Sequence, residues 1–330
     1  MKVFLFLVIV VILIIAEQLY FRIAKHYNII DKPNERSSHT KVVLRGGGII
    51  FLIGIWLYAI FFGGGQWPFL VGLTLVSVVS FVDDVHSLSN RIRLFVHFSA
   101  IILLCMGWGV LSWNCWWIII ISLILCVGII NAYNFMDGIN GITGGYTLAV
   151  LLPLAILNIK LQFTDQNLIY VILLTDLVFC FYNFRPKGKA KCFAGDVGSV
   201  GAAFIVVYLL GKVILQTGDF TYIVFLVVYG TDTILTIIHR IMLHDNIGEA
   251  HRKHAYQLMA NELHISHTQV SLLYTILQLI LSFVMFIIPQ TLWWHWGYLI
   301  GVSLTLAISY ILFMKKYYHL HEEYLSMLNK

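Results

Sequence analysis

Charged side chains are scarce in this sequence of 330 residues. Asp, Glu, Lys and Arg make up 11% of the chain, whereas a typical soluble domain has about 25%. Proline occurs five times, and the five cysteines, at 105, 115, 126, 180 and 192, lack the spacing of a metal site. Internal repeats and low-complexity tracts are absent as well. The sequence therefore excludes a soluble globular protein, a repeat protein and a cysteine-based metal centre.

Apolar residues dominate instead, at 60% of the chain with a mean hydropathy of +0.87. No soluble fold of this length could bury so much apolar surface, so lipid must cover it. The alternation of a β-barrel is absent, which leaves helices as the spanning element. We predict an all-α, polytopic integral membrane protein with one transmembrane domain over residues 1–330. Eleven runs could span the bilayer: 3–21, 47–62, 67–82, 94–111, 115–132, 145–159, 168–184, 197–215, 220–238, 268–289 and 292–314.

The basic residues predict the orientation of these helices. Of the 21 lysines and arginines, only Lys2, Lys160 and Lys212 fall on one side of the alternating scheme. The others lie in the loops 22–46, 83–93, 185–196 and 239–267 or in the C-terminal tail. Cytoplasmic loops carry such an excess. We therefore expect the N-terminus outside and the C-terminus in the cytoplasm, with four polar motifs gathered at the cytoplasmic face.

The first motif is the pair Asp83 and Asp84 at the end of the third run. Adjacent carboxylates repel each other, so at least one needs a cation or a proton. One interpretation is a metal or phosphate site with a general base. The other is a helix end held by ion pairs with Arg91 or Arg93.

The second motif is NAYNFMDG at residues 131–138. Asn131, Asn134 and Asp137 are three residues apart and therefore share one face of a helix. Glycines follow at 138, 141, 144 and 145, and they permit close approach of the backbone to a ligand. The pattern indicates a functional site more strongly than a simple helix cap, because the asparagines would otherwise face the bundle interior without a task.

The third motif is FAGDVGS, with Asp196 between two glycines just before the eighth run. This residue could be a helix N-cap or a hard oxygen ligand for magnesium. The fourth motif is AHRKHAYQ at residues 250–257. His251 and His254 could share a face of a short amphipathic helix and, with Arg252, bind a diphosphate. Its alternative role is a basic helix resting on anionic lipid.

Three further features accompany these motifs. The loop 31–48 combines Arg36, His39, Lys41 and Arg45 with three glycines, and its basic residues could anchor the chain at the membrane or contact phosphates. Asp232, near the cytoplasmic end of the ninth run, could support the site. Asp176 lies in the middle of the seventh run, where we expect a buried and hydrogen-bonded carboxyl group.

Together, the motifs resemble those of the polyprenyl-phosphate N-acetylhexosamine-1-phosphate transferase family, glycosyltransferase family 4. The similarity covers nearly the whole chain, with the Asp pair, NAYNFMDGINGITGG, AGDVGS and AHRKHAYQ in that order. RSSH…LRGGG and AHRKHAYQ are most similar to the bacterial branch that initiates O-antigen and capsule synthesis. The chain departs from the family at Asn140, where Asp is common, and at Val43 and Leu44, where Pro usually precedes the Arg. We assign Asn140 no catalytic role.

The resemblance implies transfer of an N-acetylhexosamine 1-phosphate from a UDP-sugar to undecaprenyl phosphate, with release of UMP. It implies a Mg²⁺ cofactor held by Asp196 and by an oxygen of Asn134. Asp83 or Asp84 would deprotonate or orient the lipid phosphate, or support the metal, and Asp137 would orient the site. The residues expected to bind substrate are Asn131, Arg45, His251, Arg252 and His254, the last three at the donor diphosphate.

The expected product is a lipid-diphosphate sugar that initiates cell-surface polysaccharide synthesis at the bacterial inner membrane. The expected partners are the UDP-N-acetyl sugar, undecaprenyl phosphate and membrane lipid, and no nucleic acid. A homodimer is a further hypothesis. An alternative function is a proton-coupled secondary transporter with Asp176 as its carboxylate relay. Most polar residues, however, cluster at one face rather than at the midplane where transporters bind substrate.

Overall fold

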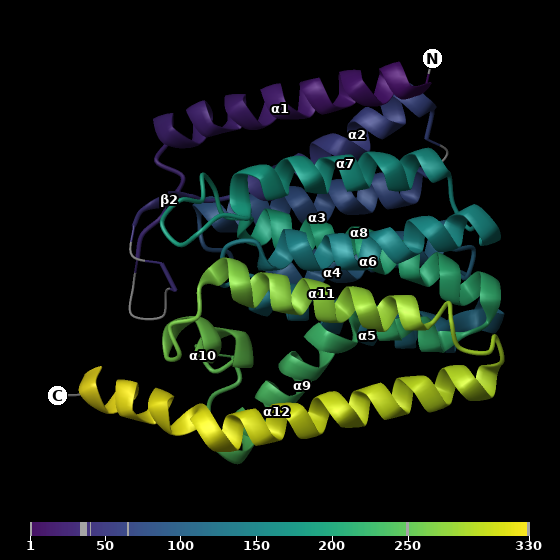
Figure 1. Ribbon diagram of the computed structural model, residues 1–330. Helices are drawn as coiled ribbons and strands as arrows, with labels where there is room; N and C mark the ends of the chain where they lie inside the picture. Colours follow the sequence, from purple (N-terminus) through teal and green to yellow (C-terminus); the bar gives the residue numbers. More distant parts are fainter. Residues whose placement is uncertain (1, 34–37, 40, 65, 249–250, 329–330) are drawn as a thin grey trace.

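The computed structural model describes residues 2–33, 38–39, 41–64, 66–248 and 251–328, so Arg36 lies outside it (Figure 1). Within these residues, ten helical segments are long and apolar enough to cross a membrane. They are α1 (Lys2–His26), α3 (Trp67–Val85), α4 (Asn90–Gly107), α5 (Trp116–Met136), α6 (Ile142–Leu161), α7 (Gln166–Asn183), α8 (Gly195–Thr217), η3 with α9 (Phe220–Leu226 and Val227–Met242), α11 (His267–Val284) and α12 (Leu292–Leu328). The predicted all-α, polytopic membrane fold is confirmed.

The remaining elements are short. The second predicted span is the 3₁₀ turn η1 (Gly47–Ile49) followed by α2 (Ile50–Phe62), a shorter apolar helix than the ten others. The last predicted span, expected to end at residue 314, continues to Leu328 as one helix. The other short elements are β1 (Ile30–Asp31), β2 (Val43–Leu44), η2 (Trp113–Cys115) and α10 (Ala255–Asn261).

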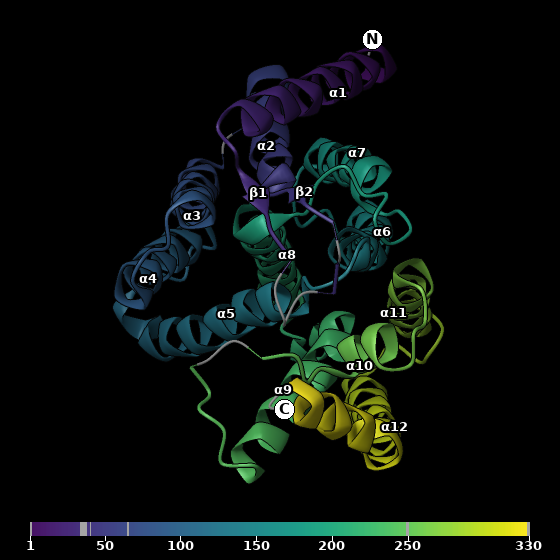
Figure 2. The same ribbon diagram turned by 90° about the vertical axis from the view of Figure 1, so that its left-hand side faces the viewer.

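Helix α8 forms the centre of the bundle. Viewed along the helices, it is surrounded by its neighbours, whereas α1 and α12 lie at the periphery (Figure 2). Accordingly, 83% of its most apolar stretch is buried, compared with 11% for α12. Because lipid is as apolar as the helices, the hydrophobic effect does not drive them together within the membrane. Their association depends on close packing instead. Small residues provide that packing: a side chain at Gly211, for example, would overlap the ring of Trp108.

The two ends of the chain lie at opposite ends of the bundle (Figure 1). The C-terminal ends of α3 and α5, the N-terminal ends of α4 and α8, and α10 all lie at the end that Figure 2 faces. This arrangement brings the four polar motifs together. That this end is cytoplasmic remains a prediction: a reporter active only in the periplasm should be silent when fused after Lys330.

Candidate active site

Glycines hold the loop after β2 against the start of α8. The amides of Gly47 and Gly48 donate to the carbonyls of Phe193 and Ala194, at 2.9 and 3.0 Å. A Cβ atom on Gly48 would lie 2.0 Å from the Cα of Gly198, and Gly46 has a φ of +81° that favours glycine. The GGG sequence thus serves close backbone packing, and this packing places Arg45 beside Asp196.

We expect Gly48→Ala to lower the stability of the protein by about 3 kcal/mol, because two backbones would have to separate. The measurement is thermal unfolding in detergent. Gly128→Ala is the matched control, since no atom lies within 4 Å of a Cβ there. Equal melting temperatures for the two variants would contradict the packing role of the glycine loop.

Asp84 caps the central helix from another part of the chain. Its two carboxylate oxygens accept the amide hydrogens of Asp196 and Val197, at 2.9 and 3.0 Å. The side chain of Asp84 is fully buried, and its Oδ1 also pairs with the Arg45 Nε at 2.7 Å. Negative charge at a helix N-terminus is stabilising. Gly195 is required beside it, because its φ is +70° and a Cβ atom there would lie 2.5 Å from Asp84 Oδ2.

Asp196 lies between two guanidinium groups. Arg45 approaches its Oδ1 at 3.4 Å and Arg93 approaches its Oδ2 at 3.5 Å, while Arg93 also pairs with Asp83 at 3.1 Å. The amide of Asn134 donates to the same Oδ1 of Asp196 at 3.0 Å. The Asp196 side chain retains 17% exposure, so it is available to a ligand while its orientation is held from three sides.

Asp137 follows the last residue of α5 and faces the same space. Its Oδ1 accepts a hydrogen bond of 2.5 Å from the Thr143 hydroxyl. The pKa of Asp137 is raised to about 7, mainly by burial. The Thr143 hydrogen bond and Arg45 oppose this rise, and the carboxylates of Asp196 and Asp84 contribute to it. A carboxyl group with this pKa can exchange a proton near neutral pH, as acid–base and metal-binding groups do.

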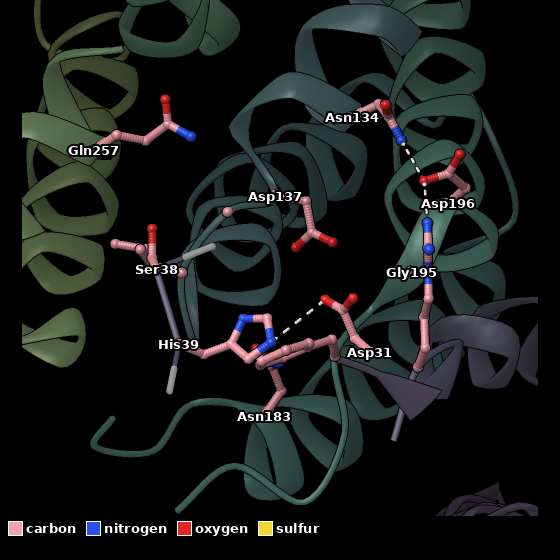
Figure 3. Close-up of a pocket in the computed structure, with 13 residues that line it drawn as sticks. Asp31, Ser38, His39, Asn134, Asp137, Asn183, Gly195, Asp196 and Gln257 are labelled. Atoms are coloured by element: carbon pink, nitrogen blue, oxygen red, sulfur yellow. Dashed lines mark hydrogen bonds and ion pairs between the residues drawn. The ribbon is translucent and has the colours of Figure 1, made fainter. Parts of the chain in front are cut away.

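Two adjoining polar cavities, of about 270 and 570 Å³, open around these residues. Figure 3 shows the first of them. Both are lined by Asn134, Asp137, Gly138 and Gln257. The first cavity is completed by Asp31, Ser38, His39, Arg45, Ile139, Asn183, Phe193, Gly195 and Asp196. The second is completed by Asn90, Arg93, Leu94, His97, Asn131, Phe135, Arg240, Ile247, Gly248, His251, His254 and Tyr256. Helices far apart in sequence thus build two neighbouring cavities that share four lining residues.

The AHRKHAYQ segment reaches the second cavity, but its part from His251 to His254 is not helical. Helix α10 begins only at Ala255, so the predicted helical face shared by His251 and His254 is wrong. Their rings nevertheless lie 5.0 Å apart, centroid to centroid. Arg252 points elsewhere: its guanidinium pairs with Glu262 at 2.6 Å and lies 4.2 Å from the centre of the Tyr324 ring. The structure therefore does not support Arg252 as a ligand of the donor.

The Asp pair also differs from the expectation. Neither Asp83 nor Asp84 lines either cavity. Asp84 is occupied by the helix amides and Arg45, and Asp83 accepts the Leu88 amide hydrogen at 2.6 Å besides pairing with Arg93. The position of the carboxylates therefore argues against direct contact with the acceptor. Asp84 and Asp83 pair with Arg45 and Arg93, respectively, and both arginines contact Asp196. Asp84 also caps the start of α8, the helix that carries Asp196.

Sequence reasoning missed several lining residues. Arg93 was considered only as an ion-pair partner at a helix end, yet it joins Asp83 to Asp196 and lines the second cavity. Asp31, Asn183 and Gln257 were not predicted at all. Asn183 had a detectable signal, because an amide at the end of an apolar run needs partners. It accepts the Gly141 amide hydrogen at 2.8 Å and donates to the Cys192 carbonyl at 2.9 Å.

The comparison with known families decides the class of the protein. The sequence pattern of Glycosyl transferase family 4 matches residues 66–214, a stretch that contains the Asp pair, NAYNFMDG and AGDVGS. Over this stretch the chain is similar to the members of this family. The AHRKHAYQ segment and the glycine-rich loop lie outside the matched stretch, so their assignment rests on the geometry above.

The proteins similar to this chain over longer stretches are bacterial transferases by name. It is 26% identical to the "Probable undecaprenyl-phosphate N-acetylglucosaminyl 1-phosphate transferase" of Bacillus subtilis (strain 168), over 94% of this chain and 89% of the relative. It is 25% and 26% identical to the "Undecaprenyl-phosphate alpha-N-acetylglucosaminyl 1-phosphate transferase" of Yersinia pestis and of Escherichia coli (strain K12). In both of these the match covers 57% of this chain and 56% of the relative, about half of its length. The protein is a multi-pass transferase of the bacterial inner membrane.

Proposed function

We propose that this family 4 enzyme transfers an N-acetylhexosamine 1-phosphate from a UDP-sugar to undecaprenyl phosphate and releases UMP. The observation that carries the proposal is the pair of adjoining polar cavities around Asp137 and Asn134 at one end of the bundle. The names of the relatives supply the substrate class. A site at the membrane surface can reach both a soluble nucleotide and a phosphate on a long apolar chain.

The electrostatics of the second cavity favour an anionic ligand. The pKa of His251 is lowered to about 3, mainly by burial and also by the neighbouring His254, Arg240 and Lys253, while Asp245 opposes the shift. Positive potential from these groups disfavours another cation but attracts a diphosphate. Arg93 adds a planar, always charged donor at the cavity wall. We propose that this cavity receives the phosphates of the donor.

The acceptor can reach the same cavity from the bilayer. Leu94 of α4 and Phe135 of α5 line the second cavity and are 43% and 41% exposed at the surface of the bundle. These apolar residues suit the first isoprene units of a lipid whose phosphate enters between the two helices. In the proposed reaction, an oxygen of the lipid phosphate forms a bond to the phosphorus that bears the sugar. The bond from that phosphorus to the bridging oxygen breaks, and the bridging oxygen leaves with UMP.

Magnesium is the proposed cofactor. Among the residues that the structure describes, no cluster of three or more His, Cys, Asp and Glu side chains could hold a metal. Mg²⁺ does not need one, because it takes oxygen ligands and keeps several waters and substrate phosphates. Asn134, Asp137 and Asp196 offer such oxygens around the first cavity. Asp196 and Asn134 would hold the ion, which when bound neutralises charge on the transferred phosphoryl group.

The protein's own residues would do the positioning. Arg45 and Arg93 hold Asp196, and Asp84 fixes the start of α8 that carries it. Preorganised charges of this kind are the main source of catalysis in phosphoryl transfer. Asp137, held by Thr143, would orient the site from the end of α5.

The test is UMP release by the purified protein with undecaprenyl phosphate and a panel of UDP-sugars. We expect magnesium-dependent UMP release with at least one UDP-N-acetylhexosamine, and none after chelation of the metal. Absence of UMP release with every donor would overturn the proposal. A proton-coupled transporter would instead need a sealed vesicle. Asp176, its candidate relay, is fully buried and lines neither polar cavity.

The variants of the AHRKHAYQ segment separate binding residues from structural ones. We expect His251→Ala to raise the donor KM about tenfold, because it removes a ring from the phosphate cavity. Arg252→Lys should leave the donor KM within about twofold, since Arg252 contacts Glu262 and Tyr324 instead. Steady-state kinetics in one detergent measures both. A larger effect of Arg252→Lys than of His251→Ala would reverse the assignment.

Two finer points also remain proposals. We propose that the lipid-diphosphate sugar initiates a cell-surface polysaccharide, O-antigen or capsule, and that the protein forms a homodimer. Deletion of the gene should abolish that polysaccharide, and mass measurement of the detergent complex gives the oligomeric state. Intact surface polysaccharide or a monomer would exclude the respective proposal.

A further inference from the structure

A buried carboxylate behind the second cavity carries an inference that rests on the proposed function and extends it. Asp232 of α9 is 3% exposed and lines neither polar cavity. Its Oδ2 accepts the hydroxyl hydrogen of Tyr274 at 2.6 Å, and its Oδ1 accepts the Ala255 amide hydrogen at 3.1 Å and the Thr236 hydroxyl hydrogen at 3.1 Å. The Nδ1 atom of His254 lies 3.2 Å from the same Oδ1.

The distance between His254 Nδ1 and Asp232 Oδ1 is that of a hydrogen bond. An ionised carboxylate can only accept, so an Nδ1–H group of His254 donates to Asp232 Oδ1 when the ring is protonated at both nitrogens. The other ring nitrogen, Nε2, is buried and has no hydrogen-bond partner among the residues that the structure describes, and His254 lines the second cavity. A nitrogen buried beside a cavity gains a partner when a ligand or water binds there, and this bond compensates its desolvation.

We propose that Asp232 is a positioning residue, which orients His254 so that Nε2–H donates a hydrogen bond to a phosphate oxygen in the second cavity. Phosphate oxygens only accept, so Nε2 must be protonated when the substrate is bound. The ring is then an imidazolium, and the adjacent carboxylate of Asp232 balances its charge. The same logic applies to metal-bound histidines, whose second nitrogen is held by an outer carboxylate.

The rest of the network holds α10 in place. The Tyr256 amide donates to Asp232 Oδ2 at 3.4 Å, and the His254 amide donates to the Gln257 side chain at 3.2 Å. Asp232 therefore links the start of α10 to α9 and α11. A purely structural role for Asp232 is the rival explanation, and the test must separate the two.

Two substitutions of His254 make this separation. Asn places its amide nitrogen near the position of Nδ1, so His254→Asn keeps a donor toward Asp232 and suits the N-cap of α10. It removes the atom that faces the cavity. We expect a melting temperature near that of the wild type and a kcat lower by about a hundredfold. His254→Gln places its amide near Nε2 and should retain more activity at a lower melting temperature.

A double-mutant cycle then tests whether Asp232 acts through His254. We expect Asp232→Asn to lower kcat at least tenfold in the wild type and to have no further effect in the His254→Asn protein. Tyr274→Phe is the matched control: it removes another donor to Asp232 and should lower the melting temperature while kcat stays within twofold. Losses that multiply in the double variant, or equal losses in the control, would overturn the inference.

Two other outcomes are also decisive. If Asp232→Asn does not yield folded protein, His254→Asn decides alone, and wild-type kcat in that variant overturns the inference. A wild-type protein that releases no UMP overturns the proposed function itself. An active wild type with an equally active His254→Asn variant overturns only the role of Asp232 and His254.

Discussion

Replacing Asp196 with Asn should lower turnover by about a thousandfold while the protein still inserts and purifies. The substitution keeps the shape of the side chain but removes the charge held between Arg45 and Arg93. In the proposed mechanism it also removes the chief metal ligand, and one lost electrostatic contact to a transition state costs about a hundred- to a thousandfold. The measurement is kcat for UMP release across a magnesium titration, together with the melting temperature in detergent.

Asp176→Asn is the matched control for this variant. It replaces another carboxyl group inside the bundle, but one that lines neither polar cavity. We expect it to retain at least half of the wild-type turnover. Near-normal activity of Asp196→Asn at low magnesium would move the metal away from Asp196. A dead Asp176→Asn variant that still folds would favour a role for the buried relay of the transporter hypothesis.

Asp84→Asn should lower both stability and activity. An amide accepts with only one of its two polar atoms, so one of the amides of Asp196 and Val197 would lose its partner and Arg45 would lose a buried counter-ion. Breaking such an arrangement costs about 3 kcal/mol. Because α8 carries Asp196, we expect turnover to fall at least tenfold as well. Thermal unfolding and kcat are measured on the same preparation.

The melting temperature distinguishes this account from a catalytic base. If Asp84 deprotonated the lipid phosphate directly, Asp84→Asn would lose turnover and keep the wild-type melting temperature. Asp83→Asn provides the comparison, because Asp83 accepts one loop amide and pairs with Arg93 without capping a helix. We expect a smaller loss of stability there than at Asp84. The reverse order would contradict the cap.

Hydropathy predicted the fold well because the bilayer restricts the choice of structure. Apolar runs of membrane length can only be helices, and their alternation brings every second loop to one face. This alternation predicts that the motifs around Asp137 and Asp196 lie at the same end of the bundle, as the structure has them. The short η1 and α2 region was harder, because its glycines serve contact with Gly198 rather than helix propensity.

The direction of individual side chains could not be predicted in the same way. The pair of carboxylates looked equivalent in the sequence, yet Asp84 caps a helix that begins more than a hundred residues later. Arg252 stands between two histidines of the second cavity, but Glu262 and Tyr324 attract its guanidinium. Such outcomes depend on tertiary partners that no local pattern encodes. His251 and His254 meet because of the extended chain before α10, not because of helical spacing.

The most direct test of the central claim follows the phosphorus atoms of the donor. A UDP-N-acetylhexosamine labelled at the sugar-linked phosphate is incubated with the purified protein, undecaprenyl phosphate and magnesium. We predict that the label moves to the lipid together with the sugar and that the released nucleotide is unlabelled UMP. Labelled UDP together with an unlabelled glycolipid would mean plain sugar transfer, and it would contradict the proposed sugar-phosphate transferase.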